Sequence, residues 1–208
     1  MKKLTVVLLA VLMTAFLATN VSAQGITGKG VKVGLNLANV AGDDVEDANS
    51  KIGFAVGGYL TYEINEKLSI QPEVMFSQKG YKIEEKLDFF GVTMSMKGTI
   101  GLNYLDVNPL VVYSLNENLR VLAGPSFGLF LNGKSKIELD IDGESEEEEE
   151  DIESDDLNGM DFGLIIGAGY NLGIVEVEAR YSLGLKNAYD EDIDMKNNVF
   201  QIVVGYSF

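Results

Sequence analysis

The chain has 208 residues, of which 46% are hydrophobic, and it carries a formal net charge of −16. This length and apolar content suit one folded domain rather than a disordered chain. Because the chain contains neither Cys nor His, disulfides, Cys/His zinc sites, Ser-His-Asp or Cys-His catalysis and haem held by Cys or His are excluded. Its acidity argues against nucleic acid as a partner. We therefore expect a protein without enzymatic activity, cofactor or resident metal.

The N-terminus predicts a secretory signal peptide. Lys2 and Lys3 precede a mainly apolar run at residues 4–18, and the segment Val21-Ser22-Ala23 follows as a cleavage site. The apolar run is shorter than the ~20 residues that a membrane helix needs, which disfavours the alternative of a retained membrane anchor. We assign residues 1–23 to a signal peptide and residues 24–208 to one mature domain.

Apolar residues alternate with small or polar ones along the rest of the chain, which predicts strands that each have one apolar face. The eight alternating segments lie at residues 31–37, 52–64, 68–77, 97–115, 126–131, 161–167, 175–185 and 200–208. In the fourth segment, Leu102 and Tyr104 fit the apolar face, but the phase changes before Leu110. We expect a β-bulge there, with Pro109 at a position that donates no ladder hydrogen bond.

The connections between these segments alternate between short and long. Short turns are predicted at residues 65–67, 116–118 and 171–173, and long polar loops at 41–50, 83–96, 133–158 and 186–198. An even number of strands, with short turns at one end and long loops at the other, is typical of an outer-membrane barrel. We therefore predict an all-β fold, an eight-stranded antiparallel up-and-down transmembrane β-barrel.

The side of each segment opposite the apolar face is rich in Gly, Ala and Ser. Small residues suit the crowded interior of an eight-stranded barrel, so we expect the apolar side to face lipid. The alternative is a secreted, soluble, lipocalin-like carrier that buries its apolar side around a ligand. The chain has no Trp for an interfacial belt, and aromatic residues near the short turns can form one instead: Tyr62, Tyr113, Tyr170, Tyr206 and Phe208.

Several segments resemble the PorT-like outer-membrane β-barrel proteins of Bacteroidetes. Residues 71–80 (QPEVMFSQKG) are similar to the third strand of that family, and residues 104–110 (YLDVNPL) to its tyrosine-leucine-acidic-aliphatic-proline segment, with Asn108 as an extra residue. Residues 178–185 (EARYSLGL) resemble the penultimate strand, and the aromatic ending resembles the last one. The resemblance implies an OmpA/OmpX-like barrel in the outer membrane of a Gram-negative bacterium, and it implies a location more than an activity.

Four charged residues are expected to point into the lumen: Glu73, Glu176, Glu178 and Arg180. We interpret them as an ion-pair plug, in which Arg180 neutralises carboxylates that the narrow lumen partly dehydrates. An ion-binding site or a proton path is the alternative, which the small bore of eight strands disfavours.

A run of acidic residues lies in the longest predicted loop, at about residues 133–158: Glu146, Glu147, Glu148, Glu149, Glu150 and Asp151. One interpretation is a surface site for a divalent cation such as Ca²⁺ or for a cationic partner, since hard cations bind oxygen ligands. Because the spacing lacks the pattern of an EF-hand loop, we favour a solvated, self-repelling and disordered loop.

The predicted role is structural or adhesion-like, carried by the loops around a plugged lumen. A narrow pore is one alternative, and a secretion-associated barrel like the founding PorT-like member is another. The expected partners are outer-membrane lipid and the barrel-assembly machinery, for which Val204, Tyr206 and Phe208 form the expected C-terminal signal.

Overall fold

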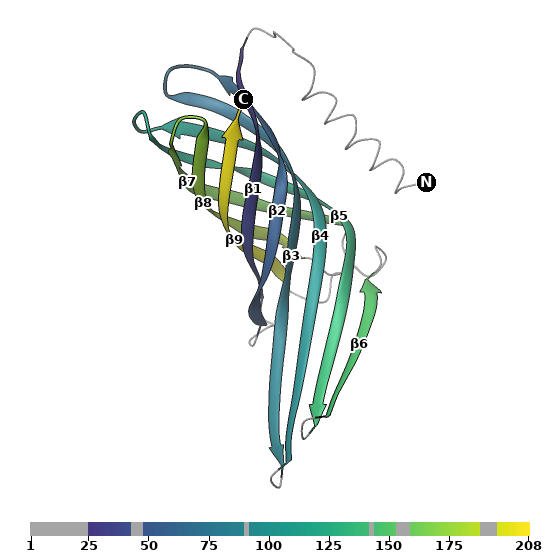
Figure 1. Cartoon of the computed structure of the whole chain (residues 1–208). Helices are drawn as coiled ribbons and strands as arrows, with labels where there is room; N and C mark the ends of the chain where they lie inside the picture. Colours follow the sequence, from purple (N-terminus) through teal and green to yellow (C-terminus); the bar gives the residue numbers. More distant parts are fainter. Residues whose placement is uncertain (1–24, 43–47, 90–91, 142–143, 153–158, 188–194) are drawn as a thin grey trace.

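The computed structural model describes residues 25–208 except 43–47, 90–91, 142–143, 153–158 and 188–194, and the predicted signal peptide at 1–23 lies outside the described residues. The strands in the described residues (Figure 1) are β1 (Ile26–Ala41), β2 (Ala48–Glu63), β3 (Leu68–Phe89), β4 (Val92–Ser114), β5 (Leu119–Ile141), β6 (Glu144–Ile152), β7 (Met160–Asn171), β8 (Val175–Asn187) and β9 (Lys196–Ser207). None of the described segments is a helix of the length and hydropathy needed to cross a membrane.

Eight of these strands close into an antiparallel barrel, which confirms the predicted fold. The ring runs β1-β2-β3-β4-β5-β7-β8-β9, and β9 pairs with β1 from Gly30 opposite Ser207 to Ala41 opposite Lys196. Within the described residues, β6 pairs with β5 alone and is not part of the ring. Closure leaves no strand edge in the wall. A β-structure needs this to cross a bilayer, because hydrocarbon offers no hydrogen-bond partner.

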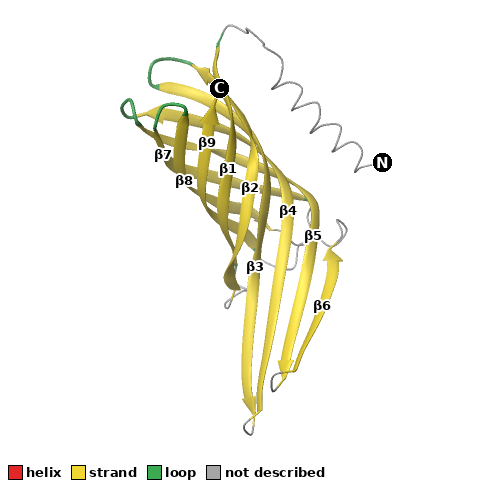
Figure 2. Cartoon of the chain, in the orientation of Figure 1, coloured by secondary structure: helices red, strands yellow, loops and turns green. Residues whose placement is uncertain are grey.

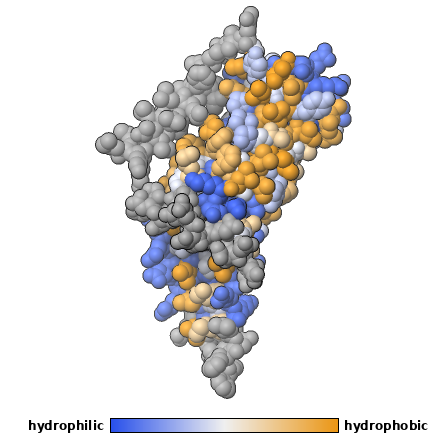
Figure 3. All heavy atoms as spheres, turned by 180° about the vertical axis from the view of Figure 1, so that it is seen from behind, coloured by the Kyte–Doolittle hydropathy of each residue, from blue (hydrophilic) through white to orange (hydrophobic). Residues whose placement is uncertain are grey.

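The outward side chains of the barrel are apolar, and the lumen holds the polar and charged side chains together with a smaller apolar cluster. On β1, Val33 and Leu35 are 54% and 64% exposed, whereas Lys32 and Asn36 are fully buried in the lumen. The alternation continues on the other strands of the ring, and large hydrophobic patches are exposed on the upper part of the molecule in Figure 3. A soluble barrel would bury the apolar set. The wall therefore faces lipid, and the alternative of a soluble lipocalin-like carrier is excluded.

Two belts limit the lipid-facing band. Near the short turns, the five aromatic residues of the predicted belt all point outward and are exposed: Tyr62, Tyr113, Tyr170, Tyr206 and Phe208. Toward the other end, the outward positions of three adjacent strands become polar at Gln78, Asn103 and Asn132, which lie opposite one another. The Nδ2 of Asn103 donates to Oδ1 of Asn132 at 2.7 Å. On this side of the barrel the hydrocarbon ends at these residues, which we call the polar belt.

Four strands continue past the polar belt as a sheet, which we call the extension. It consists of residues 81–89 of β3, 92–101 of β4, 133–141 of β5 and 144–152 of β6. At a rise of about 3.3 Å per residue, the run of β5 from Asn132 to Ile141 measures about 30 Å. The extension therefore projects well beyond the rest of the rim (Figure 2).

The predictions of long loops at residues 83–96 and 133–158 are wrong over most of their length, because both segments continue as paired strands. The acidic residues 146–151 lie in β6 rather than in a disordered loop. Pairing with β5 places Lys134 opposite Asp151 and Lys136 opposite Glu149. These cross-strand lysines offset the repulsion that the acidic run suggests when it is considered alone.

The prediction of a β-bulge around Pro109 is also wrong. β4 pairs with β3 without a shift of register, and the extra residue in the pairing of β4 with β5 is Leu131 on β5. The apolar phase of β4 changes because part of the lumen is itself apolar. Leu102 and Tyr104 are fully buried inside the barrel rather than on the lipid face, and Leu110 belongs to an apolar cluster in the lumen.

Because the barrel wall faces lipid, a charged residue placed on it should destabilise the protein. Ile166, near the middle of β7, is 54% exposed, and Ile166→Arg should lower the free energy of unfolding by about 2–4 kcal/mol. The control Gln78→Arg, in the polar belt, should cost at most about 1 kcal/mol. Urea titration in lipid vesicles, followed by tyrosine fluorescence, measures both values. Equal losses for the two variants would contradict the position of the band.

Candidate functional site

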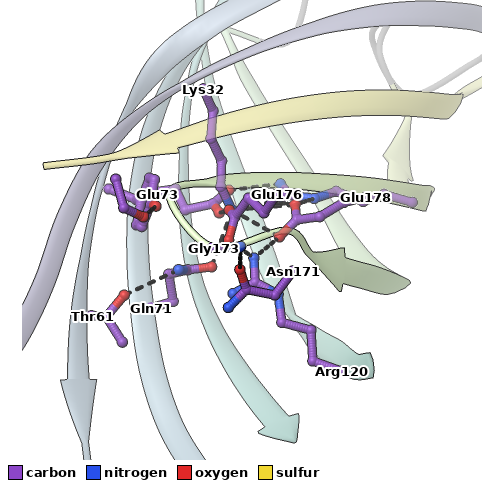
Figure 4. Close-up of polar contacts among 12 residues, drawn as sticks. Lys32, Thr61, Gln71, Glu73, Arg120, Asn171, Gly173, Glu176 and Glu178 are labelled. Atoms are coloured by element: carbon purple, nitrogen blue, oxygen red, sulfur yellow. Dashed lines mark hydrogen bonds and ion pairs between the residues drawn. The ribbon is translucent and has the colours of Figure 1, made fainter. Parts of the chain in front are cut away.

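The four predicted lumen residues lie in one ionic cluster near the short turns. Glu73 comes from β3 and the other three come from β8, and all are at most 5% exposed. Lys32 of β1 reaches every carboxylate, with its Nζ 2.6 Å, 3.1 Å and 3.0 Å from the nearest oxygens of Glu73, Glu176 and Glu178. Figure 4 shows Lys32 and Arg120 approaching these carboxylates from opposite sides. The structure therefore brings the four residues together.

Arg180 joins two walls of the barrel through its guanidinium group. Its Nη1 and Nη2 donate to the two carboxylate oxygens of Glu73 at 2.7 and 2.8 Å, and its Nε donates to Oε2 of Glu178 at 2.7 Å. Gln71 accepts a hydrogen bond from Lys32 and donates one to Thr61, each at 3.1 Å. The charged groups of Arg180, Glu73 and Glu178 are thus hydrogen-bonded as well as paired, which is the condition for offsetting their loss of hydration. Among the described residues, Oε1 of Glu176 has an ion-pair partner in Lys32 but no hydrogen bond of good geometry.

Two cations of the cluster, Lys32 and Arg120, are not among the four predicted lumen residues. Arg120, on β5, pairs with Glu176 and Glu178. With Arg120 the cluster contains three cations and three carboxylates and is neutral. The fifth predicted segment begins at residue 126 and therefore does not include Arg120. The signal was present, because Val121 and Ala123 are apolar on the outward face and place Arg120 on the inward one.

Two glycines provide the space for these long side chains. A Cβ atom at Gly169 would lie 3.0 Å from Nε of Arg120 and 3.0 Å from Cγ of Glu178, and one at Gly205 would lie 2.6 Å from Cγ of Glu176. The small residues that the sequence places opposite the apolar face are therefore positions that large charged neighbours fill.

A second ionic group lies farther along the lumen, toward the extension. The Nζ of Lys79 lies 3.1 Å from Oδ1 of Asp106, 2.9 Å from Oδ2 of Asp161 and 4.8 Å from the ring centre of Tyr104. All four residues are buried. This group was not predicted, because Lys79, Asp106 and Asp161 come from three strands that only the closed ring brings together.

Apolar side chains close the lumen beyond the second ionic group. They form two clusters, one of Val40, Tyr81 and Met195, and one of Leu102 and Tyr104 packed against Ile100, Phe130 and Ile152. Between the two ionic groups, a cavity lined by residues that include Asp106 and Arg180 has a volume of about 10 Å³, which suffices for about one water molecule. Charged side chains from β1, β3, β5 and β8 thus fill the cross-section, and an apolar mouth follows.

The acidic run is divided between the two faces of the extension. Because side chains alternate along a strand, Glu147 and Glu149 lie on the face of Lys136 and Lys134 and pair with them, while the even-numbered glutamates lie on the opposite face. The hydrogen bond from Lys134 lowers the pKa of Glu149, and hydrogen bonds to Glu138 and Glu147 raise the pKa of Lys136 to about 12. In the described part of the chain, no three acidic side chains converge as a metal site.

A known protein family accounts for a barrel with a lipid-facing wall. The family described as outer membrane protein beta-barrel domain matches residues 23–190. The chain belongs to this family. It is therefore a protein of the outer membrane, with lipid around its wall. In such barrels the short turns lie on the periplasmic side and the longer connections outside the cell, which places the extension on the extracellular side.

Three proteins of known structure match the chain at low identity. Ail, the attachment invasion locus protein of Yersinia pestis, is 16% identical with a TM-score of 0.47, and the match covers 89% of this chain and 100% of Ail. Neisserial surface protein A is 13% identical (TM-score 0.48, coverage 89% and 100%), and OprG of Pseudomonas aeruginosa is 11% identical (TM-score 0.38, coverage 88% and 97%). No curated protein is significantly similar to the chain.

The residues of the expected C-terminal signal all point outward at the periplasmic end of this outer-membrane barrel. Val204, Tyr206 and Phe208 are 41%, 47% and 61% exposed. The backbone N–H of Phe208 donates to the carbonyl of Lys29 at 3.0 Å, which ties the end of the chain to β1. Recognition of this ending by the barrel-assembly machinery stays a prediction.

The charge balance of the lumen cluster predicts the effect of removing one cation. Arg180→Leu leaves one buried negative charge in excess and should lower the free energy of unfolding by about 3–5 kcal/mol. The double variant Arg180→Leu/Glu73→Gln restores neutrality and should recover part of that loss. Urea titration in vesicles and the gel mobility of unboiled samples report both variants. A single variant as stable as wild type would contradict the role of the cluster.

The two faces of β6 predict opposite effects of two neighbouring substitutions. Glu149→Gln removes the pair with Lys134, and the amides of β6 should exchange about two- to fivefold faster. Glu148→Gln removes an unpaired charge between like charges, so exchange should be unchanged or slower. Since pairing lowers the pKa of Glu149 below its ordinary value of 4.5, the effect of Glu149→Gln should be present at neutral pH and disappear as the pH falls through that lowered pKa. Hydrogen exchange read by mass spectrometry measures these rates, and equal acceleration by both variants would contradict the assignment of faces.

Proposed function

We propose that this outer-membrane protein is a sealed, non-enzymatic barrel with an adhesion-like role, carried by its extracellular extension. The single observation that supports the proposal is the contrast between the two ends of the same strands. Inside the membrane, they fill the lumen with buried ion pairs, and outside it they form a tall sheet with two exposed faces. The ion-paired side chains of the lumen hold the strands of the barrel together, whereas the barrel closes without any contact from the extension.

The filled cross-section argues against a pore as the main role. Lys32, Glu73 and Arg180 are at most 2% exposed, and both Lys32 and Arg180 donate hydrogen bonds to Glu73. Passage of an ion would require separating these groups in a bore that holds little water, and breaking a buried pair costs several kcal/mol. The same lack of access argues against catalysis by the lumen carboxylates, which a substrate cannot reach.

Within the outer-membrane family, we place the chain in the PorT-like group of Bacteroidetes. Support comes from the segments 71–80, 104–110 and 178–185, which fall on β3, β4 and β8 of the barrel. The assignment concerns ancestry, and a role in secretion is not carried over from it. Insertion by the barrel-assembly machinery through the ending at Val204, Tyr206 and Phe208 belongs to the same proposal.

A cationic partner suits the extension better than a bound divalent cation. The alternation of β6 turns adjacent carboxylates of the run 146–151 to opposite faces, so they cannot surround one ion from this strand alone. Rows of carboxylates along a strand instead suit a partner with several positive charges spaced along a surface.

Planar-bilayer recordings and a trimmed variant test the proposal together. The wild-type protein should give no conductance steps, because the ion cluster blocks the lumen. In the trimmed variant, an Asn-Gly turn replaces residues 134–151 and joins Gly133 to its partner Ile152, since this dipeptide closes a two-residue hairpin. Its barrel should keep the gel mobility of unboiled wild type, while cells that display it should attach less to protein-coated surfaces. Steady conductance by the wild type, or undiminished attachment of cells that display the trimmed variant, would contradict the proposal.

A further inference from the structure

The inner face of the extension, which continues the lumen-facing side of the barrel wall, is apolar although it lies beyond the membrane. Register places side chains of β4 and β5 next to one another on this face. Five large apolar residues there are between 37% and 44% exposed: Met94, Met96, Ile137, Leu139 and Ile141. In Figure 3, hydrophobic atoms lie between hydrophilic ones on the lower part of the molecule, where the extension projects.

Lipid does not account for this apolar face. The outer face of the same sheet carries every lysine of the extension, at Lys82, Lys86, Lys97, Lys134 and Lys136. A sheet only one layer thick with lysines on one side stands in water rather than in hydrocarbon. The apolar face is also continuous with the apolar mouth of the lumen through Ile83 and Ile100. Contiguous exposed apolar surface of this kind on a water-exposed element marks an interaction site.

Charge is distributed unequally between the two faces. The inner face has no lysine or arginine within the described extension, and its apolar residues lie between Glu85 on β3 and the even-numbered glutamates of β6. Leu139 lies opposite Glu146, Ile137 opposite Glu148, and Ser135 opposite Glu150. On the outer face the neighbouring Glu147 and Glu149 are paired with lysines. Within the described residues, the inner-face glutamates form no such pair, so their charge is available to a partner.

We propose that the inner face of the extension binds a basic amphipathic segment of another polypeptide. Its apolar side chains would cover Met96, Ile137 and Leu139, and its Lys or Arg side chains would pair with Glu146, Glu148 and Glu150. The proposal rests on the adhesion-like role stated above and names the chemistry of the partner. Apolar area supplies the attraction, and the glutamates on both borders select a basic partner over a neutral or acidic one.

Other occupants fit the face less well. A second copy of this chain would bring its own acidic strand toward the glutamates, and the chain as a whole carries a formal net charge of −16. A simple cation would leave the apolar residues exposed to water. Only a partner with both apolar and cationic side chains complements the whole face.

A binding assay with a defined peptide tests the proposal. The full-length mature protein is placed in nanodiscs of zwitterionic lipid. The probe is a fluorescent synthetic peptide of alternating leucine and lysine, about as long as β6, with empty nanodiscs as the blank. One control peptide replaces leucine with serine, and another replaces lysine with glutamate. Binding of the leucine-lysine peptide alone supports the proposal. Equal binding of the serine-lysine peptide would show charge attraction only and would overturn it.

Matched variants locate the site on one face. Glu146→Gln/Glu148→Gln/Glu150→Gln should weaken peptide binding about tenfold. The control Glu84→Gln/Glu147→Gln/Asp151→Asn removes as many charges from the outer face and spares the pair of Lys134 with Glu149, so it should change binding less than twofold. Ile137→Thr/Leu139→Thr should weaken binding by a similar factor of about ten, because it removes apolar contact while keeping residues that favour a strand. Equal weakening by the inner and outer charge variants would overturn the proposal.

Two further measurements separate the possible failures. Hydrogen exchange on each variant should show β6 still protected, so that a loss of binding can be told from a loss of the strand. Sedimentation of the protein in detergent shows whether the face is covered by a second copy, and a dimer that Ile137→Thr/Leu139→Thr dissociates would overturn the proposal. If the protein shows no conductance and does not bind the leucine-lysine peptide, the proposed partner is wrong but the sealed barrel stands. If the protein conducts ions, the proposed function is wrong, and with it the basis for the partner.

Discussion

The structure depends on one constraint: inside hydrocarbon, each backbone N–H and C=O must find its partner within the protein. Pairing of β9 with β1 meets this requirement, because it joins the two ends of the sheet and removes the last open edge from the wall. The orientation of the side chains follows from closure in lipid. The outward face must be apolar, so polar and charged residues are confined to the lumen. Only where the strands leave the lipid can an open edge such as that of β6 exist, because water then satisfies its backbone groups.

Because the charged side chains are confined to the lumen, they must balance one another's charge there as well as fill the space. Near the periplasmic end the balance is complete, since Lys32, Arg120 and Arg180 meet three carboxylates and share hydrogen bonds with them. Toward the extracellular end, Lys79 faces two carboxylates and is covered by the apolar mouth. Buried ion pairs of this kind add little stability relative to apolar packing, but each one is costly to disrupt. They therefore define one arrangement of the strands and close the bore at the same time.

Much of the barrel could be predicted from the sequence, because alternation is a local property. The strands, the short turns and the inward direction of Glu73, Glu176, Glu178 and Arg180 all follow from a period of two residues. What could not be predicted depends on pairing between distant segments. The acidic run of β6 repels itself and forms a strand only beside the lysines of β5. The alternation along β4 wrongly predicts Leu102 and Tyr104 on the lipid face, because they are apolar residues inside the lumen. The group around Lys79 exists only once the ring has closed.

The acidity of β6 also affects how copies of the protein meet in the plane of the membrane. Its hydrogen-bonding edge has no neighbouring strand within the described residues, and an unpaired edge is ordinarily a place where two molecules join into a longer sheet. Here a second β6 approaching in that way would bring one row of carboxylates against another in water, where like charges at contact distance repel. Pairing of the extensions of two copies edge to edge is therefore disfavoured. Neighbouring copies in a crowded membrane approach one another through their barrel walls instead.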